Sequence, residues 1–116
     1  MSINTSRWRH AAALSIVSAA LSTSAGAADD AAQLTLGKQL FMSGTAPACA
    51  VCHTLNDAGS QGAIGPVLDE LKPDAARVAK AVKGGIGQMP PFGDKLSEAQ
   101  IAALAAYVAK ATGAVP

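Results

Sequence analysis

The sequence has no excess of charge of either sign and few of the residues that build metal sites. Its 116 residues contain nine lysines and arginines against eight aspartates and glutamates. A nucleic-acid-binding domain would carry a clear basic excess, so this balance argues against that class. Outside the first 27 residues the chain has only two cysteines and one histidine, so a structural zinc site there would need a carboxylate to complete its four ligands.

The sequence also lacks a long apolar run near its start. The most apolar stretch there, residues 11–21, contains two serines and falls short of the ~20 apolar residues that a membrane-spanning helix needs. It follows a segment with two arginines and precedes an Ala-Gly-Ala motif, an order typical of secretory signal peptides. We therefore predict that residues 1–27 are a signal peptide cleaved after Ala27 and that the protein is exported to the periplasm. A retained membrane tether is the alternative.

The remaining chain, residues 28–116, is short and has few large side chains for a core. Without Arg7 and Arg9 it has seven basic and eight acidic residues, hence a net charge of −1. The only tryptophan, Trp8, lies in the predicted signal peptide, and aromatic residues make up just 3% of the chain. A domain of this size usually needs a cross-link, metal or cofactor in addition to its core. The chain is therefore expected to contain a motif that provides one.

Cys49-Ala50-Val51-Cys52-His53 is the covalent attachment signature of c-type haem. Two thiols three positions apart can add to the two vinyl groups on one edge of a porphyrin, and the adjacent imidazole then faces the iron. We predict one haem c, attached through Cys49 and Cys52, with His53 as an iron ligand. A thiol-disulfide centre is the main alternative, but the sequence lacks the alternating strands and helices typical of thioredoxin-like proteins.

The second axial ligand of the iron has two candidates, Met42 and Met89. The predicted mature chain has no second histidine, and both cysteines are used by the haem. Met42 lies just before Cys49, on the limb of chain that carries the proximal side, and is predicted to fill the core instead. Met89 lies 36 residues beyond His53, and the prolines at 90–91 hold its loop extended. Met89 is therefore the predicted ligand.

Three helices and no strand are predicted, so the domain should be all-α. The first begins with Asp30 as its cap and runs to residue 43 or 44. The second begins with Pro73 as its first residue and ends at the glycine pair 84–85. The third begins at a capping box formed by Ser97 and Gln100 and ends near residue 111.

Together these features resemble the small class I cytochromes c of the bacterial periplasm, over essentially the whole mature chain. The resemblance implies three or more helices wrapped around one covalently bound haem, with the N- and C-terminal helices crossing. It also implies that Gly37 lets Tyr107 come close at this crossing, where Phe41 packs, and that the carbonyl of Pro66 accepts the Nδ1–H of His53. It rests on Gly37, Phe41, the haem motif, Gly65-Pro66-Val67-Leu68, Met89-Pro90-Pro91-Phe92 and Tyr107.

An iron atom bound by both His53 and Met89 leaves no position for a substrate, so we predict a single-electron carrier, not an enzyme. The resemblance implies a periplasmic dehydrogenase as electron donor and a terminal oxidase or another cytochrome as acceptor. Residues 65–74 and 87–90 are similar to cytochromes that accept electrons from periplasmic sulfite dehydrogenases. The alternative function is a haem protein with a displaceable sixth ligand, acting in gas sensing or peroxide chemistry.

Partner docking is expected at the haem edge near the two cysteines, because redox encounters use small interfaces. Three basic residues of the second predicted helix, Arg77, Lys80 and Lys83, could steer an acidic partner there. A row of charges on an exposed helix face is also compatible with simple solvation.

Overall fold

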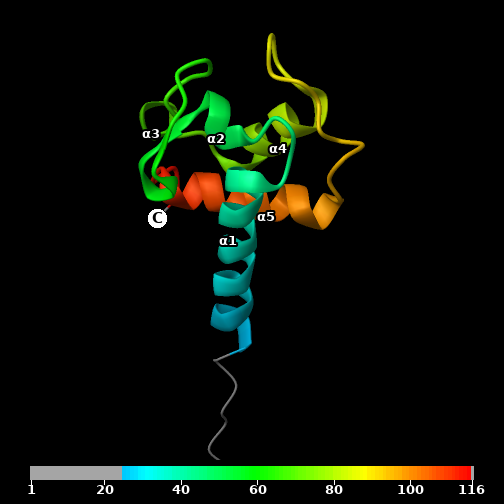
Figure 1. Ribbon diagram of the computed structural model, residues 1–116. Coiled ribbons are helices and arrows are strands. Elements are labelled where there is room, and N and C mark those ends of the chain that lie inside the picture. The colour runs from blue at the N-terminus through cyan, green and yellow to red at the C-terminus, as the bar shows by residue number, and fades with distance from the viewer. Residues whose placement is uncertain (1–24, 116) are drawn as a thin grey trace, which may run out of the picture.

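The computed structural model describes residues 25–115, which fold into a mainly helical domain (Figure 1). The long helix α1 (Ala25–Ser43) crosses α5 (Glu98–Ala111), and α4 (Ala75–Gly84) packs on α5. The chain between α1 and α4 forms shorter elements: α2 (Cys49–Cys52), β1 (Thr54–Leu55), η1 (Asn56–Ala58), β2 (Ser60–Gln61) and α3 (Leu68–Leu71). The all-α prediction is confirmed in its main elements.

The crossing of α1 and α5 depends on a glycine. A Cβ atom at Gly37 would overlap the Ala103 carbonyl of α5 and lie 2.5 Å from the Tyr107 Cβ. Two carbon atoms in ordinary contact are ~3.5–4.0 Å apart, so no larger residue fits here without moving a helix. The Phe41 ring packs edge-on against the Tyr107 ring, with centroids 6.2 Å apart. The predicted crossing and the roles of these three side chains in it are confirmed.

The core lies where α1, α4 and α5 meet and continues under the short elements. Phe41, Leu55, Ile101 and Leu104 are its most deeply buried large side chains. Phe92 and Leu96 add the loop between α4 and α5 to the same cluster. The aromatic residues are thus few, but Phe41, Phe92 and Tyr107 are all buried.

The helix starts were predicted with mixed success. Ser97 and Gln100 form the expected capping box, since each side chain accepts the backbone N–H of the other. The cap of α4 is Asp74, whose carboxylate accepts the Arg77 N–H at 2.7 Å, so the prediction that Pro73 begins this helix is wrong by two residues. The prediction of a cap at Asp30 is also wrong, because α1 begins at Ala25. Alanine has the highest helix propensity, and the Ala-rich segment before Gln33 continues the helix.

The short elements between α1 and α4 were not predicted from the sequence, and the prediction of no strand is wrong, because β1 and β2 form a hairpin. Its strands pair Thr54 with Gln61 and Leu55 with Ser60, around a turn that ends in the left-handed Gly59. Two-residue strands are too short to show a period-two pattern, so no periodicity could indicate them. The hairpin follows directly after His53 and fixes the backbone there.

The predicted signal peptide falls largely outside the described residues, which include only its last three positions, 25–27, at the start of α1. In the described part of the chain, no helix combines the length and apolarity required to cross a membrane.

Candidate functional site

The residues predicted to form the site surround a cavity of about 460 Å³. This volume lies within the range of cofactor and ligand pockets. Cys49, Cys52, His53, Pro66 and Met89 all line it. The remaining lining is mostly apolar and includes core side chains of α1, α4 and α5, among them Phe41, Val82, Leu104 and Val108. The structure therefore brings together all five predicted site residues, from segments up to 40 residues apart.

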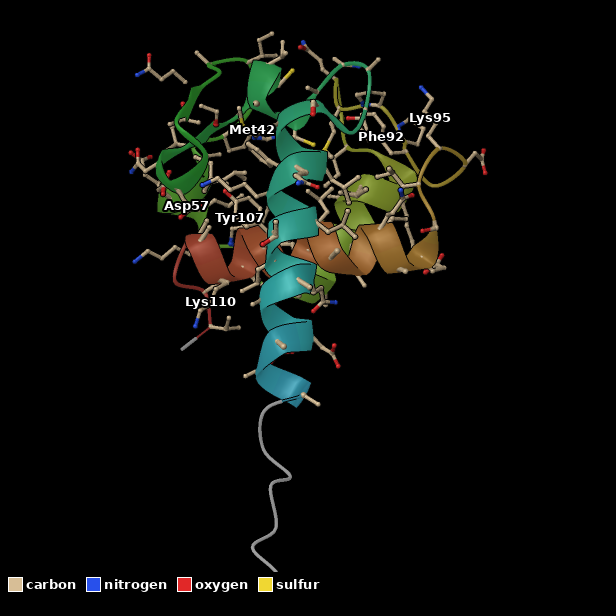
Figure 2. All side chains as sticks on the ribbon, turned by 60° about the horizontal axis from the view of Figure 1, so that its bottom comes forward. Met42, Asp57, Phe92, Lys95, Tyr107 and Lys110 are labelled. Carbon is tan, nitrogen blue, oxygen red and sulfur yellow. The ribbon has the colours of Figure 1, made fainter. Side chains whose placement is uncertain are left out.

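Met42, the other methionine considered as a ligand, does not line this cavity. Its side chain is 42% exposed, so the prediction that it fills the core is wrong (Figure 2). Met42 and Phe41 are neighbours on α1, and only Phe41 lies on the buried face of the helix. Of the two candidates, only Met89 is placed to reach a group in the cavity.

The two cysteines belong to the single turn of α2. Side chains three positions apart lie on the same face of a helix, which explains why both thiols reach the same cavity. Both thiols are free and partly buried, and burial raises the pKa of the Cys49 thiol. The described residues contain no cluster of three His, Cys, Asp or Glu side chains that could hold a metal ion.

The imidazole of His53 is held by the chain that follows it. Its Nδ1 lies 2.9 Å from the carbonyl oxygen of Pro66, as the resemblance implied. A carbonyl can only accept a hydrogen bond, so Nδ1 carries the proton and the lone pair lies on Nε2. Gly65 packs against the ring, where a Cβ would be 2.5 Å from Cε1, and its N–H donates to the Cys52 carbonyl at 2.7 Å. A larger residue at this position would force the imidazole to move.

The backbone of His53 is held from the other side by Ser60, a residue that the sequence did not single out. The buried Ser60 hydroxyl donates to the His53 carbonyl at 2.9 Å and accepts the Leu55 N–H at 3.0 Å. Thr54 adds a second side-chain bond, to the Gly62 carbonyl at 2.9 Å. From the sequence, residues 55–65 were predicted to be a loop, and nothing in its composition distinguishes a structural serine from a solvated one.

Met89 lies on a tight turn after α4. Ile86 and Met89 exchange two backbone hydrogen bonds, of 2.8 and 3.1 Å, which close the turn. The Phe92 N–H then donates to the Val82 carbonyl at 2.8 Å, so the chain returns to the last turn of α4. The Met89 side chain is partly buried against the core. Its loop is thus fixed on both sides.

The charged groups at the site are few. Among the described residues that line the cavity, Arg77 is the only one with a permanent charge. Of the predicted basic row, Lys83 is paired with Glu98 at 2.7 Å, whereas Lys80 is exposed on α4. The row therefore does not act as one uniform positive face, and Arg77 belongs to the cavity.

A second charged cluster ties η1 to the helix crossing, away from the cavity. The Tyr107 hydroxyl donates to the Asp57 carboxylate at 2.6 Å, and the Lys38 ammonium lies 3.3 Å from the same oxygen (Figure 2). The tyrosine hydrogen bond holds the pKa of Asp57 below its usual value, while burial and the carboxylate raise the pKa of Tyr107. This cluster joins α1, η1 and α5, and it was not predicted from the sequence.

These residues fit the predicted cofactor. Two thiols on one helical turn face an apolar cavity, beside an imidazole whose Nε2 is free to bind a metal. The imidazole is packed against Gly65, where a larger residue would force the ring to move. The fold and the cavity thus define a protein of the c-type haem class.

Comparisons with known proteins agree with this class. A family described as cytochrome c oxidase, cbb3-type, subunit III matches residues 32–108. Cytochrome c6 of Picosynechococcus is 40% identical over 106 residues, which cover 78% of this chain and 80% of that protein. Chloroplastic cytochrome c6 of Chlamydomonas reinhardtii is 32% identical over 111 residues, covering 84% of this chain and 68% of that protein.

The crystal structure of the c-type cytochrome SorU from Sinorhizobium meliloti is also similar. It is 48% identical, with a TM-score of 0.69, and the match covers 72% of this chain and 94% of SorU. The chain therefore belongs to the cytochrome c family, as a small class I cytochrome with a single haem. It carries haem c bound through Cys49 and Cys52, and it is an electron carrier rather than an enzyme.

Proposed function

We propose that this protein is a periplasmic single-electron carrier whose haem iron is ligated by His53 and Met89. The observation that carries the proposal is that both side chains line the cavity that also holds the two haem-binding cysteines. The haem supplies the exchange of one electron between ferrous and ferric iron. A thioether ligand favours the ferrous state, so the potential should lie toward the oxidising end of the range for haem proteins.

The residues around the ligands hold them in place. Pro66 fixes the proton on Nδ1 of His53, which directs Nε2 to the metal and makes the imidazole a better donor. Arg77 lines an otherwise uncharged cavity, and we propose that its guanidinium pairs with a propionate carboxylate of the haem. Apolar side chains exclude water from the rest of the cavity and so limit solvent rearrangement when the charge of the site changes.

The alternative, a gas-sensing or peroxide-reacting haem, requires a sixth ligand that leaves easily. The closed turn at Met89 argues against it, because two backbone hydrogen bonds and the return to α4 fix the loop. Carbon monoxide added to the reduced protein should therefore cause no immediate spectral change. A rapid shift of the Soret band at low gas concentration would favour the alternative.

Electron partners should dock where the cavity opens. Ile64 and Ile86 both line the cavity and are 67% and 65% exposed, and Val51, between the cysteines, is 58% exposed. Apolar side chains at the entrance to a redox centre suit the small, short-lived interfaces of electron-transfer complexes. We call Ile64 and Ile86 the mouth residues.

The donor that we propose is a periplasmic sulfite dehydrogenase. Residues 65–74 and 87–90 are similar to cytochromes that accept electrons from such enzymes, and both segments contribute to the cavity lining. A terminal oxidase or another cytochrome is the proposed acceptor.

Stopped-flow reduction by a sulfite dehydrogenase tests this docking proposal. An Ile64→Ser/Ile86→Ser variant should react about tenfold more slowly, which corresponds to a loss of ~1.4 kcal/mol of apolar contact. Leu36→Ser is the matched control, because Leu36 is 38% exposed on α1 and does not line the cavity. Equal rates for both variants would contradict docking at the mouth residues, and no reduction of the parent protein would contradict the donor.

Export is tested on the protein isolated from the periplasmic fraction of its source. N-terminal sequencing should give Ala28 as the first residue, within one position. A chain that begins before residue 20 would show that the signal is retained and that the tether alternative is correct.

A further inference from the structure

The turn that carries Met89 packs on Gly85. Neither the haem motif nor the choice of Met89 as a ligand requires a glycine at this position. Gly85 follows the last residue of α4, and its N–H caps the helix by donating to the Ala81 carbonyl at 2.8 Å. The chain then runs through the turn to Met89 and comes back over Gly85 before it returns to α4. In Figure 1 this segment is the yellow loop that leaves α4.

Two features of Gly85 exclude any other residue. Its φ of 71° and ψ of 166° lie in a region that is essentially restricted to glycine. In addition, a Cβ atom there would lie 2.6 Å from the Met89 carbonyl oxygen and 3.0 Å from the Pro91 nitrogen. These are backbone atoms, so the overlap cannot be relieved by rotating a side chain. Relief would require the segment from Met89 to Pro91 to move away from α4.

The neighbouring glycines do not share this property. Gly84 is the last residue of α4 and has open space where a Cβ would be. Gly87 has a φ of 55°, which disfavours other residues, but a Cβ there also meets nothing within 4 Å. Gly84 thus serves as a control for added volume in open space and Gly87 as a control for a positive φ, whereas only Gly85 combines a positive φ with contact with the Met89 backbone.

We propose that Gly85 is a positioning residue for the sixth ligand, and that its bare Cα forms the surface on which the Met89 backbone rests so that the sulfur reaches the iron. This inference rests on the proposed ligation by Met89. The hydrogen bonds between Ile86 and Met89 fix the shape of the turn, and the contact with Gly85 fixes the distance between the turn and α4. A residue that moves the turn outward withdraws the sulfur and leaves the iron open to other ligands.

The test compares Gly85→Ala with Gly84→Ala and Gly87→Ala, in the haem-loaded protein. For the ferric form we expect Gly85→Ala to lose most of the near-infrared band of sulfur-bound iron and to have a lower midpoint potential. Its apparent affinity for added imidazole should rise at least about tenfold. Imidazole binds only those molecules in which the sulfur has left the iron, so its apparent affinity is proportional to the fraction of such molecules. The two control variants should keep the band and stay within about twofold of the parent in imidazole affinity.

Three other results would each contradict the inference, and they show whether the proposed ligation by Met89 fails with it. If Gly85→Ala keeps the band, the potential and the imidazole affinity while Met89→Ala abolishes the band, the inference is wrong and the proposed ligation stands. If Gly87→Ala behaves like Gly85→Ala, strain at a positive φ is responsible and the contact is not. If Met89→Ala keeps the band, the proposed ligation fails and the inference fails with it.

A stabilised background covers the case in which Gly85→Ala does not fold. Gly84→Ala replaces glycine by the best helix former at an unobstructed position, which should add stability to α4. The same three measurements on the Gly84→Ala/Gly85→Ala double variant, with Gly84→Ala as the reference, should show the same loss of sulfur ligation. A double variant that matches Gly84→Ala overturns the inference.

Discussion

Replacing Gly37 by alanine gives the clearest expected effect on stability, because the opposing contributions can be worked out separately. On an exposed helix surface the change would stabilise the chain by ~1 kcal/mol, since glycine is a poor helix former. Here the new Cβ overlaps the Ala103 carbonyl and lies 2.5 Å from the Tyr107 Cβ, where ~3.5–4.0 Å is needed. The two helices must separate by about 1 Å over their main contact, so the Leu40 and Phe41 packing is lost in part.

Overpacking of a well-packed core typically costs about 1–3 kcal/mol. Contact with a backbone atom leaves little room for relaxation, so we expect a cost at or above the upper end and a net loss of about 2 kcal/mol after the gain in helix propensity. For a domain of this length, such a loss lowers Tm by roughly 8–16 °C.

Guanidinium unfolding of the haem-loaded protein, followed by far-UV circular dichroism, measures the change in free energy. Gly84→Ala is the matched control, because it adds the same methyl group to α4 in open space. It should leave the free energy of unfolding unchanged or raise it by less than ~1 kcal/mol. A Gly37→Ala variant as stable as Gly84→Ala, with an unchanged denaturant slope, would refute the close crossing of α1 and α5.

Three further results are expected. Tyr107→Phe should lose ~1 kcal/mol at pH 7, since the bond to a carboxylate is partly exposed. The bond lowers the folded-state pKa of Asp57, so its contribution is present above the unfolded pKa of ~3.9 and is lost as pH falls through the folded pKa. The free energies of unfolding of parent and variant should therefore converge once the pH is below the lowered pKa of Asp57. Ser60→Ala should cost about 1–3 kcal/mol, because two backbone groups beside the haem motif lose their partner. Without haem, the Cys49→Ala/Cys52→Ala chain should show no cooperative thermal unfolding.

Controls for these three use the same chain. Ser43→Ala removes an exposed hydroxyl from α1 and should be nearly neutral, so an equal loss for Ser60→Ala would show that burial is not the cause. A gap between parent and Tyr107→Phe that persists at low pH would assign the effect to packing instead of Asp57. A sharp, cooperative transition in the double cysteine variant would show that the core forms without the cofactor.

The parts of the site that the sequence predicted are those whose chemistry requires residues at a fixed local spacing. The thiols of Cys49 and Cys52 must lie one turn apart to reach one porphyrin edge, and a capping box needs its two members three positions apart. Gly37 and Pro66 were found only through the resemblance to a family. Both involve residues more than ten positions apart that become neighbours by folding.

The contacts that the sequence did not predict are of this long-range kind and have no family signature to reveal them. Tyr107 and Asp57 are 50 residues apart, and the resemblance assigned Tyr107 a place only in the helix crossing, while Asp57 alone resembles an ordinary surface residue. Ser60 lies in a segment, 55–65, that was predicted only as a loop. Gly85 was predicted only as the end of a helix, since its contact with the Met89 carbonyl depends on how the chain returns. Met42 was assigned to the core because its class of side chain favours burial, whereas the rotation of α1 decides its exposure.

The central claim is that Met89 and His53 bind the haem iron from this cavity, and the near-infrared spectrum of the ferric protein tests it most directly. The parent protein should show the weak band of sulfur bound to ferric iron, Met89→Ala should lose it, and Met42→Ala should retain it. A band that survives Met89→Ala, or that disappears in Met42→Ala alone, would contradict the account.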